Sequence, residues 1–361
     1  MLNTVIQDMR MEIVNDAKRW DFLVDKFEVH DVYYTYQYCN SAALLEDGVA
    51  KLIYFKNILG EVLYPVIIRK IETDSELDFY DITTPYGYGG PLISGEVTVL
   101  EEFKQVFESY CHAHGIISEV IRLHPLLDNA SYLSTYCELK YIRKTTAVNL
   151  DEGIEKVRQN YTKMNKRNIH KAKKSQLVCK KVEKTYENIE KFETLYQATM
   201  NRRHATEYYF FDSHFLRKQL ADTSISKSHL LFAYHEDTVI AAVILYTSGK
   251  LAHYHLGASD KEYLHLRPNN LLFDFMIELT WQHNCEILHL GGGYQEDDNL
   301  FKYKTSFTNN NNYDYFIGMN IFDEESYQQV VERKRHDYEL TEGFFPQYRG
   351  LGIRLSDQIS S

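Results

Sequence analysis

The sequence lacks long apolar runs and any regular cysteine pattern. No stretch of the 361 residues approaches the ~18 apolar residues that a membrane-spanning helix needs, and charged residues interrupt Met1 to Trp20, where a secretion signal would require an apolar segment. The five cysteines are scattered, odd in number and without a Cys-x-x-Cys pair, which favours a reducing compartment over a disulfide framework. These absences predict a cytoplasmic protein with no integral membrane segment.

Several familiar functional signatures are also missing. The chain has no Gly-x-Ser-x-Gly elbow, so a serine nucleophile of that type is unsupported. His253 and His255 alternate on an expected strand, but zinc requires at least one more ligand, and we predict no metal. The formal charge of -11 argues against a surface that binds nucleic acid throughout, because such affinity comes from many Lys and Arg contacts to phosphates. We therefore expect no DNA partner and, at most, a local anion site.

The length exceeds a single typical core, so two domains are expected. Hydrophobic residues make up 44% of the chain and charged residues 25%, which is typical of a folded protein without disordered tracts. No internal repeat is visible at the level of residues. We place the boundary between residues 1–150 and residues 151–361.

Hydrophobic periodicity predicts a mixed α/β first half. A glycine-rich element, Thr84 to Pro91, interrupts it after an apolar run at 77–84. The expected elements are a hairpin at 51–55 and 61–69, a helix at 97–112, and strands at 116–123 and 141–149.

The second half begins with helices and continues with antiparallel strands. Pro268 opens a further amphipathic helix, since proline is tolerated in a first helical turn. The expected elements are helices around 152–174, 186–203 and 212–222, strands at 228–235, 238–247 and 250–256, the helix from Pro268, and a strand at 286–290.

The last of these strands runs into three glycines, Gly291, Gly292 and Gly293. Glycines open the backbone so that a ligand can approach main-chain N–H groups without a Cβ in the way. Tyr303 and Lys304 follow shortly, and the lysine places positive charge near the opening. This combination predicts a site for an anionic or carbonyl-bearing substrate.

A second charged feature is a run of basic residues on one expected helix. Helical spacing puts the following residues on one face: Lys163, Arg167, His170, Lys171 and Lys174. Such a face is suited to phosphate, although a charge run of this kind is also typical of an ordinary solvated surface.

Together these motifs resemble the Fem-type (FemABX-like) aminoacyl and peptidyl transferases of the GNAT superfamily, and their relatives described as BioF2-like acetyltransferases. The resemblance rests on the order and spacing of these segments: 84–91, 122–125, the helix with Arg167, the run from Leu195 to Arg202, the strand 253–257, and 291–304. It implies two tandem GNAT-like subdomains. It also implies a peptidoglycan or polysaccharide precursor, small or linked to lipid or nucleotide, as acceptor. The resemblance implies no tightly bound cofactor and an acyl donor that is either aminoacyl-tRNA or acyl-CoA.

The resemblance also assigns roles to individual residues. Tyr303 and Lys304 match an aromatic-lysine pair near the reacting carbonyl, where the Lys304 ammonium would stabilise the developing oxyanion. We expect this segment to be a strand, on which only one of Lys302 and Lys304 lines the site; an ordinary strand-edge lysine is the alternative. Arg202 matches a position that contacts acceptor phosphates, with Arg167 assisting; an exposed helical arginine is the alternative.

The glycine-rich element of the first half is a second site candidate. Tyr86 and Tyr88 are suited to stacking on a sugar or contacting a peptide, although Gly-Gly-Pro is also a sound structural turn. Arg122 and His124 share one face of their strand, and His124 is suited to remove a proton from the acceptor amine, unless it is a structural histidine.

One departure weakens the case for CoA. The Arg-x-x-Gly-x-Gly/Ala turn that holds pyrophosphate in GNAT domains is replaced by Arg267, Pro268, Asn269 and Asn270, although a helix N-terminus there still attracts phosphate. Three functions remain open: a Fem-like aminoacyltransferase, an acyl-CoA-dependent N-acetyltransferase acting on a sugar or peptide amine, and a non-catalytic binding protein of the same fold.

Overall fold

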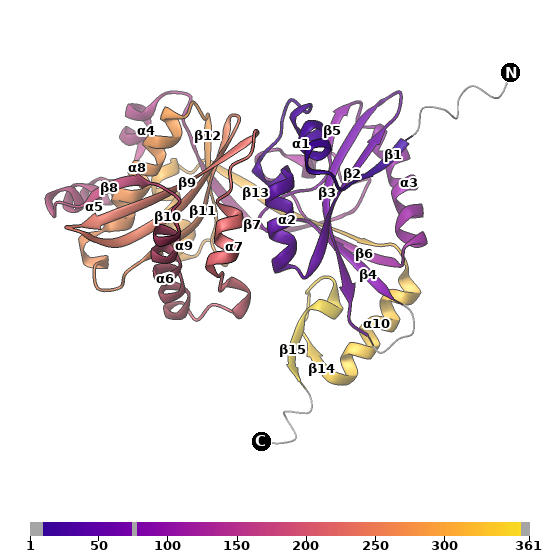
Figure 1. Ribbon diagram of the computed structural model, residues 1–361. Coiled ribbons are helices and arrows are strands. Elements are labelled where there is room, and N and C mark those ends of the chain that lie inside the picture. The colour runs from indigo at the N-terminus through magenta and orange to yellow at the C-terminus, as the bar shows by residue number, and fades with distance from the viewer. Residues whose placement is uncertain (1–9, 74–77, 355–361) are drawn as a thin grey trace. The chain divides into compact units, whose positions relative to one another are not determined.

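The computed structural model describes residues 10–73 and 78–354, and the chain forms two compact units (Figure 1). Unit 1 comprises residues 1–27, 42–142 and 315–361, and unit 2 comprises residues 28–41 and 143–314. Three elements carry the chain from one unit to the other: α2 (Tyr36–Leu45), β7 (Glu138–Asn149) and β13 (Asn312–Ile321). Each unit is a mixed, mostly antiparallel sheet with helices, which confirms the predicted α/β class.

The sheet of unit 1 has the strand order β1-β2-β3-β4-β6-β13, and β5 pairs with β3. Among the described strands of this sheet, β4 and β6 pair in parallel and the other ladders are antiparallel. The predicted hairpin is confirmed as β2 and β3. The strands and helices are β1 (Arg10–Val14), α1 (Ala17–Asp25), β2 (Gly48–Lys56), β3 (Gly60–Ile71), β4 (Phe79–Thr83), β5 (Leu92–Gly95), α3 (Val99–Ala113), β6 (Ile116–Arg122), α10 (Glu324–Asp337), β14 (Tyr338–Leu340) and β15 (Leu351–Arg354).

The core of unit 1 forms where α3 covers the sheet. Phe103 and Phe107 of α3 lie at helical spacing, and their rings pack against Phe55 of β2 and Tyr64 of β3. All four side chains are fully buried. This aromatic core explains why the apolar periodicity of residues 97–112 predicted the helix correctly.

The sheet of unit 2 has the order β7-β12-β11-β10-β9-β8, in which only β11 and β12 pair in parallel. The predicted strands and helices of this half are confirmed except for the strand at 302–304, while β8 was not predicted. The elements are α4 (Ile154–Asn160), α5 (Lys163–Lys174), β8 (Val178–Val182), α6 (Tyr186–Arg202), α7 (Ser213–Gln219), β9 (Ser226–His235), β10 (Thr238–Ser248), β11 (Leu251–Ser259), α8 (Pro268–Gln282), β12 (Ile287–Gly292) and α9 (Asn299–Thr308).

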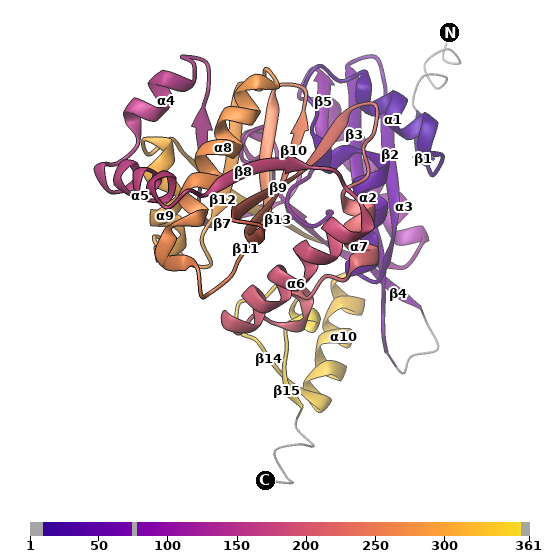
Figure 2. The same ribbon diagram turned by 60° about the vertical axis from the view of Figure 1, so that its left-hand side comes forward.

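Helices cover both faces of this sheet (Figures 1 and 2). Residues from α5 and α8 share one core cluster with alternate residues of β10, Ala241, Val243 and Leu245. The buried Phe192 of α6 is not part of that cluster, although α6 packs against β10 and β11. Burial on both faces accounts for the nearly continuous apolar sequence of β10.

One predicted strand is wrong. Residues 302–304 lie in helix α9, which Asp298 caps by accepting a hydrogen bond from the Phe301 amide at 2.7 Å. In a helix, residues two apart point to nearly opposite sides, so Lys304 is buried while Lys302 is exposed. Within residues 10–73 and 78–354, no helix is both long and apolar enough to cross a bilayer.

Candidate active site

The central feature of unit 2 is the divergence of its two parallel strands. β11 and β12 pair only at Leu251–Ile287, Ala252–Leu288 and His253–His289. Beyond this point β11 stays beside β10 as far as Ser259, and β12 stays beside β7 as far as Gly292. Each of the two outer ladders contains a register shift, which bends a strand locally. The carboxyl ends of β11 and β12 therefore separate, and the sheet opens.

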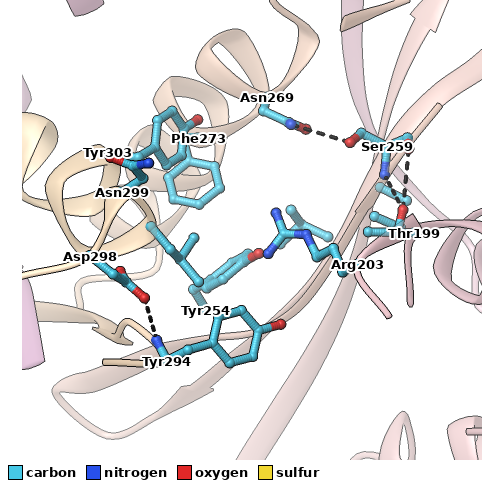
Figure 3. Close-up of a pocket in the computed structure, with 15 residues that line it drawn as sticks. Thr199, Arg203, Tyr254, Ser259, Asn269, Phe273, Tyr294, Asp298, Asn299 and Tyr303 are labelled. Atoms are coloured by element: carbon cyan, nitrogen blue, oxygen red, sulfur yellow. Dashed lines mark hydrogen bonds between the residues drawn. The ribbon is translucent and has the colours of Figure 1, made fainter. Parts of the chain in front are cut away.

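A pocket of about 590 Å³ lies at this opening, and all of its lining residues belong to unit 2 (Figure 3). The ends of α6 and β11 and the starts of α8 and α9 surround it, and four aromatic side chains form much of its wall. The lining residues are Thr199, Arg203, Ala242, Val243, Tyr254, Gly257, Ala258, Ser259, Asn269, Phe273, Tyr294, Asp298, Asn299, Leu300 and Tyr303. This mixture of apolar walls and a few polar groups is typical of small-molecule sites.

Tyr303 and Lys304 occupy different positions relative to the pocket. Tyr303 lines the pocket. Its hydroxyl is buried and neither accepts nor donates a hydrogen bond among the described residues. Lys304 does not line it; the Nζ atom lies 5.5 Å from the centre of the Tyr254 ring and donates to the Gly292 carbonyl at 2.7 Å. Burial, reinforced by the nearby charge of Arg143, lowers the pKa of Lys304 to about 7. The lysine thus titrates near neutrality behind an aromatic wall of the pocket.

The three glycines allow other parts of the protein to approach closely. Gly291 has φ +74°, a left-handed conformation that favours glycine, at the register shift of β12. A Cβ at Gly292 would lie 2.8 Å from the Lys144 carbonyl oxygen, and a Cβ at Gly293 would collide with the Asp298 carboxylate. None of the three lines the pocket. They shape its border, because they let β12 and the Asp298 loop pack tightly.

Asp298 is a pocket-lining residue that the sequence did not single out. Besides capping α9, its carboxylate accepts hydrogen bonds from the amides of Tyr294 at 2.6 Å and Gln295 at 3.2 Å. Burial alone would raise its pKa, but these backbone N–H groups hold the pKa of Asp298 below its usual value. An aspartate just before an apolar stretch is a recognised helix-start signal, and it was overlooked when the segment was interpreted as a strand.

The two arginines that end α6 have different surroundings. The Arg202 guanidinium donates to the Ser259 carbonyl at 3.0 Å, which ties the helix to the end of β11. Its neighbour Arg203 reaches into the pocket (Figure 3). The sequence alone did not separate these adjacent residues, because the difference depends on where α6 ends.

Arg122 belongs to unit 1, where its guanidinium is engaged by the protein itself. It donates to the Thr83 hydroxyl at 3.0 Å and the Thr84 carbonyl at 2.8 Å, and it forms an ion pair with the buried Glu46 at 3.1 Å. These contacts hold the glycine-rich element against the end of β6, where the Gly89 amide also donates to the Arg122 carbonyl at 2.7 Å.

His124, Tyr86 and Tyr88 also belong to unit 1. His124 is buried, and its Nδ1 accepts a hydrogen bond from the Leu127 amide at 3.3 Å, so the neutral ring carries its proton on Nε2. The Tyr88 ring lies 5.5 Å from the His124 ring, and both Tyr86 and Tyr88 are partly exposed. The structure thus brings the Tyr88 and His124 rings together.

The basic face is confirmed as one side of a helix. Arg167 and the other four residues of this face are exposed on α5, and none of them lines the pocket. His253 of β11 is buried, in contrast to the basic face of α5. Its Nε2 is hydrogen-bonded to the Asp31 carboxylate within unit 2.

The corresponding helices of the two units differ at their first turns. Each connects the two parallel strands of its sheet, α3 between β4 and β6 and α8 between β11 and β12. The first turn of α3 contains Glu101 and Glu102, whereas that of α8 contains no acidic residue and places Asn269 in the pocket wall. A helix N-terminus attracts anions, and two glutamates cancel this attraction in unit 1. Only α8 is therefore suited to an anionic ligand at this position.

Comparison with known proteins agrees with this geometry. Residues 156–305, which include the divergent strands and α8, match the family described as acetyltransferase (GNAT) domain. A solved structure of FemX is similar over 88% of this chain and 99% of that chain, with 13% identity and a TM-score of 0.65. The structure of L-PGS from Bacillus licheniformis is similar over 84% and 91%, with 12% identity and a TM-score of 0.54. No curated protein matches the sequence significantly.

The predicted resemblance to the Fem-type family is thus confirmed at the level of the fold, with a GNAT domain where the divergent strands lie. Residues 156–305 match the model of an acetyltransferase (GNAT) domain, and the chain shares its fold with the solved structure of FemX.

Proposed function

We propose that this protein transfers an acyl or aminoacyl group to an amine of a cell-wall or polysaccharide precursor, and that the activated acyl donor occupies the pocket of unit 2. The observation that supports this most directly is the pocket at the diverging ends of β11 and β12, beside the first turn of α8. The reacting partners are an ester or thioester carbonyl and a neutral amine.

The proposed reaction needs few chemical groups from the protein. The amine lone pair attacks the carbonyl carbon, a tetrahedral oxyanion forms, and its collapse breaks the bond to the ester oxygen or thioester sulfur. The amine loses a proton and the leaving group gains one, so positioning supplies much of the rate enhancement. Lys304 supplies positive charge beside the Tyr254 wall, and Tyr303 supplies a hydroxyl without a partner among the described residues.

The acceptor site is part of the same proposal. Tyr86, Tyr88, Arg122 and His124 of unit 1 are proposed to contact the acceptor, and the His124 ring is proposed to take part in the transfer of the amine proton. Arg202 and Arg167 are the less favoured contacts, because Arg202 is bonded to Ser259 and Arg167 is exposed on α5. Gly291, Gly292 and Gly293 are proposed to border the opening rather than to bind substrate.

A second function, N-acetylation from acyl-CoA, is favoured by the GNAT match at residues 156–305. It is also favoured by the first turn of α8, which contains no acidic residue. The missing pyrophosphate turn counts against it. The third function, binding without catalysis, would be favoured by a structural ion pair at Lys304. Among the described residues Lys304 has no ion pair, and its hydrogen-bond acceptor is a backbone carbonyl.

The test is binding followed by turnover. Thermal stabilisation is measured with acetyl-CoA, aminoacyl-tRNA and a UDP-linked muramyl peptide in parallel, because selective binding to the folded state raises the melting temperature. Mass spectrometry then detects the acylated acceptor with the wild type, Lys304→Met, and Lys302→Met as the matched control on the exposed side of α9. If no donor stabilises the protein and no acylated product forms, the proposal fails.

A further inference from the structure

The pocket contains a positive charge that the protein leaves uncompensated. Arg203 extends from the end of α6 into the cavity, where Figure 3 shows its guanidinium and the Tyr254 hydroxyl directed toward each other. Among residues 10–73 and 78–354 this guanidinium makes no hydrogen bond and no ion pair, in contrast to that of Arg202. A guanidinium has five N–H donors in a planar fork that matches the oxygens of phosphate or carboxylate.

The electrostatic surroundings of Arg203 also favour an anion. Its charge opposes the rise that burial causes in the pKa of Tyr254, and it helps to lower the pKa of Lys304. The one acidic side chain that lines the pocket, Asp298, already accepts three backbone N–H groups. A cationic site whose acidic neighbour is engaged elsewhere is suited to bind a ligand anion.

The position of this charge is opposite the helix start where a GNAT pyrophosphate turn would lie. In this chain Arg267 has a left-handed conformation and Pro268 removes one amide donor from the first turn of α8. Asn269, in the same turn, lines the pocket and donates to the Ser259 hydroxyl at 3.4 Å. The backbone at this turn offers fewer N–H groups than a glycine-rich turn, so a side chain must supply donors.

We propose that Arg203, with the hydroxyl of Tyr254, binds a phosphate group of the acyl donor and replaces the missing pyrophosphate turn. This inference rests on the proposed function, because it assumes that the donor occupies the pocket. The phosphate has two sources, the diphosphate of CoA or the 3′-terminal nucleotides of an aminoacylated RNA. The recognised chemistry is the same in both cases.

The test compares ligands that differ in phosphate. Dissociation constants are measured by calorimetry on the full-length protein for CoA, for pantetheine, which has the same thiol arm without phosphate, and for an RNA minihelix ending in CCA. Arg203→Met is compared with Arg217→Met, which removes the same charge from an exposed position on α7 outside the pocket. We expect Arg203→Met to weaken the binding of CoA or of the minihelix by roughly 10- to 100-fold, because hydrogen bonds to charged groups contribute binding free energy of that size. Pantetheine binding and the Arg217→Met variant should be unchanged.

The outcomes separate this inference from the proposed function. Loss confined to CoA identifies acyl-CoA as the donor, and loss confined to the minihelix identifies an aminoacylated RNA. If wild-type protein binds CoA or the minihelix and Arg203→Met binds it equally well, the role of Arg203 is overturned while the donor pocket stands. If wild-type protein binds neither but binds inorganic pyrophosphate through Arg203, the anion site stands and the proposed donor is wrong. If the wild-type protein binds none of CoA, the minihelix and inorganic pyrophosphate, the inference is overturned.

Discussion

Lys304 provides a prediction in which stability and activity change in opposite directions. Its folded pKa of about 7 lies below the value of 10.5 for an exposed lysine. Between these two values the unfolded chain keeps a proton that the folded protein releases, so the unfolded state binds more protons and stability rises with pH through this window. The charge of Lys304 therefore costs the folded protein about 4 kcal/mol at pH 7 and about 2 kcal/mol at pH 9.

Replacing Lys304 by Met removes this cost but leaves the partly buried Gly292 carbonyl without its donor, which costs at most about 3 kcal/mol. We expect Lys304→Met to be at least as stable as the wild type at pH 7. Its advantage should shrink by about 2 kcal/mol at pH 9, because the wild type gains stability over that range. If the lysine also stabilises the oxyanion, turnover should fall about 100- to 1000-fold.

The assay is urea denaturation of both proteins at pH 7 and pH 9, with acyl transfer measured on the same preparations. Lys302→Met is the control, since Lys302 is exposed on the same helix and its replacement should change neither quantity. A stability difference between Lys304→Met and wild type that is the same at both pH values would refute the reasoning about burial. Unchanged turnover would remove Lys304 from the reaction.

Three further predictions follow from unit cores and the pocket wall. Burial raises the pKa of Glu119 to about 7, so this group should contribute a loss of about 3 kcal/mol in stability between pH 4.5 and pH 8, because the folded state retains a proton that the unfolded chain releases. Glu119→Gln should remove this contribution in urea titrations, and a pH profile identical to that of the wild type would contradict the assignment. A Cβ at Gly257 would collide with the Tyr254 hydroxyl, so Gly257→Ala should displace the Tyr254 ring and raise the KM for the acyl donor about tenfold. A KM equal to that of the wild type would show that the ring does not border the donor. Asp298→Ala should lower the free energy of unfolding by about 1 kcal/mol because the α9 cap is lost, whereas Asp298→Asn should retain most of the stability of the cap. Thermal melts measure both effects, and equal melting temperatures for the wild type and the two variants would argue against the cap.

The sequence by itself determined the elements whose side chains repeat with a clear period. The α3 periodicity, the β2–β3 hairpin and the α8 start at Pro268 were predictable because local propensity and one buried face agree there. The family resemblance added the tandem arrangement, which no residue-level repeat revealed. The segment 302–304 was mispredicted because its apolar and lysine residues fit a strand edge as well as a helix, and the cap at Asp298 decides between them.

Only the tertiary structure decided which polar groups line the pocket. Arg202 and Arg203 are adjacent in sequence, but the end of α6 directs one to Ser259 and the other into the cavity. The same holds for Lys302 and Lys304, of which one is exposed and the other is buried at a pKa of about 7. Burial and charge environment depend on residues distant in sequence, such as Arg143 and Gly292, that only folding brings together.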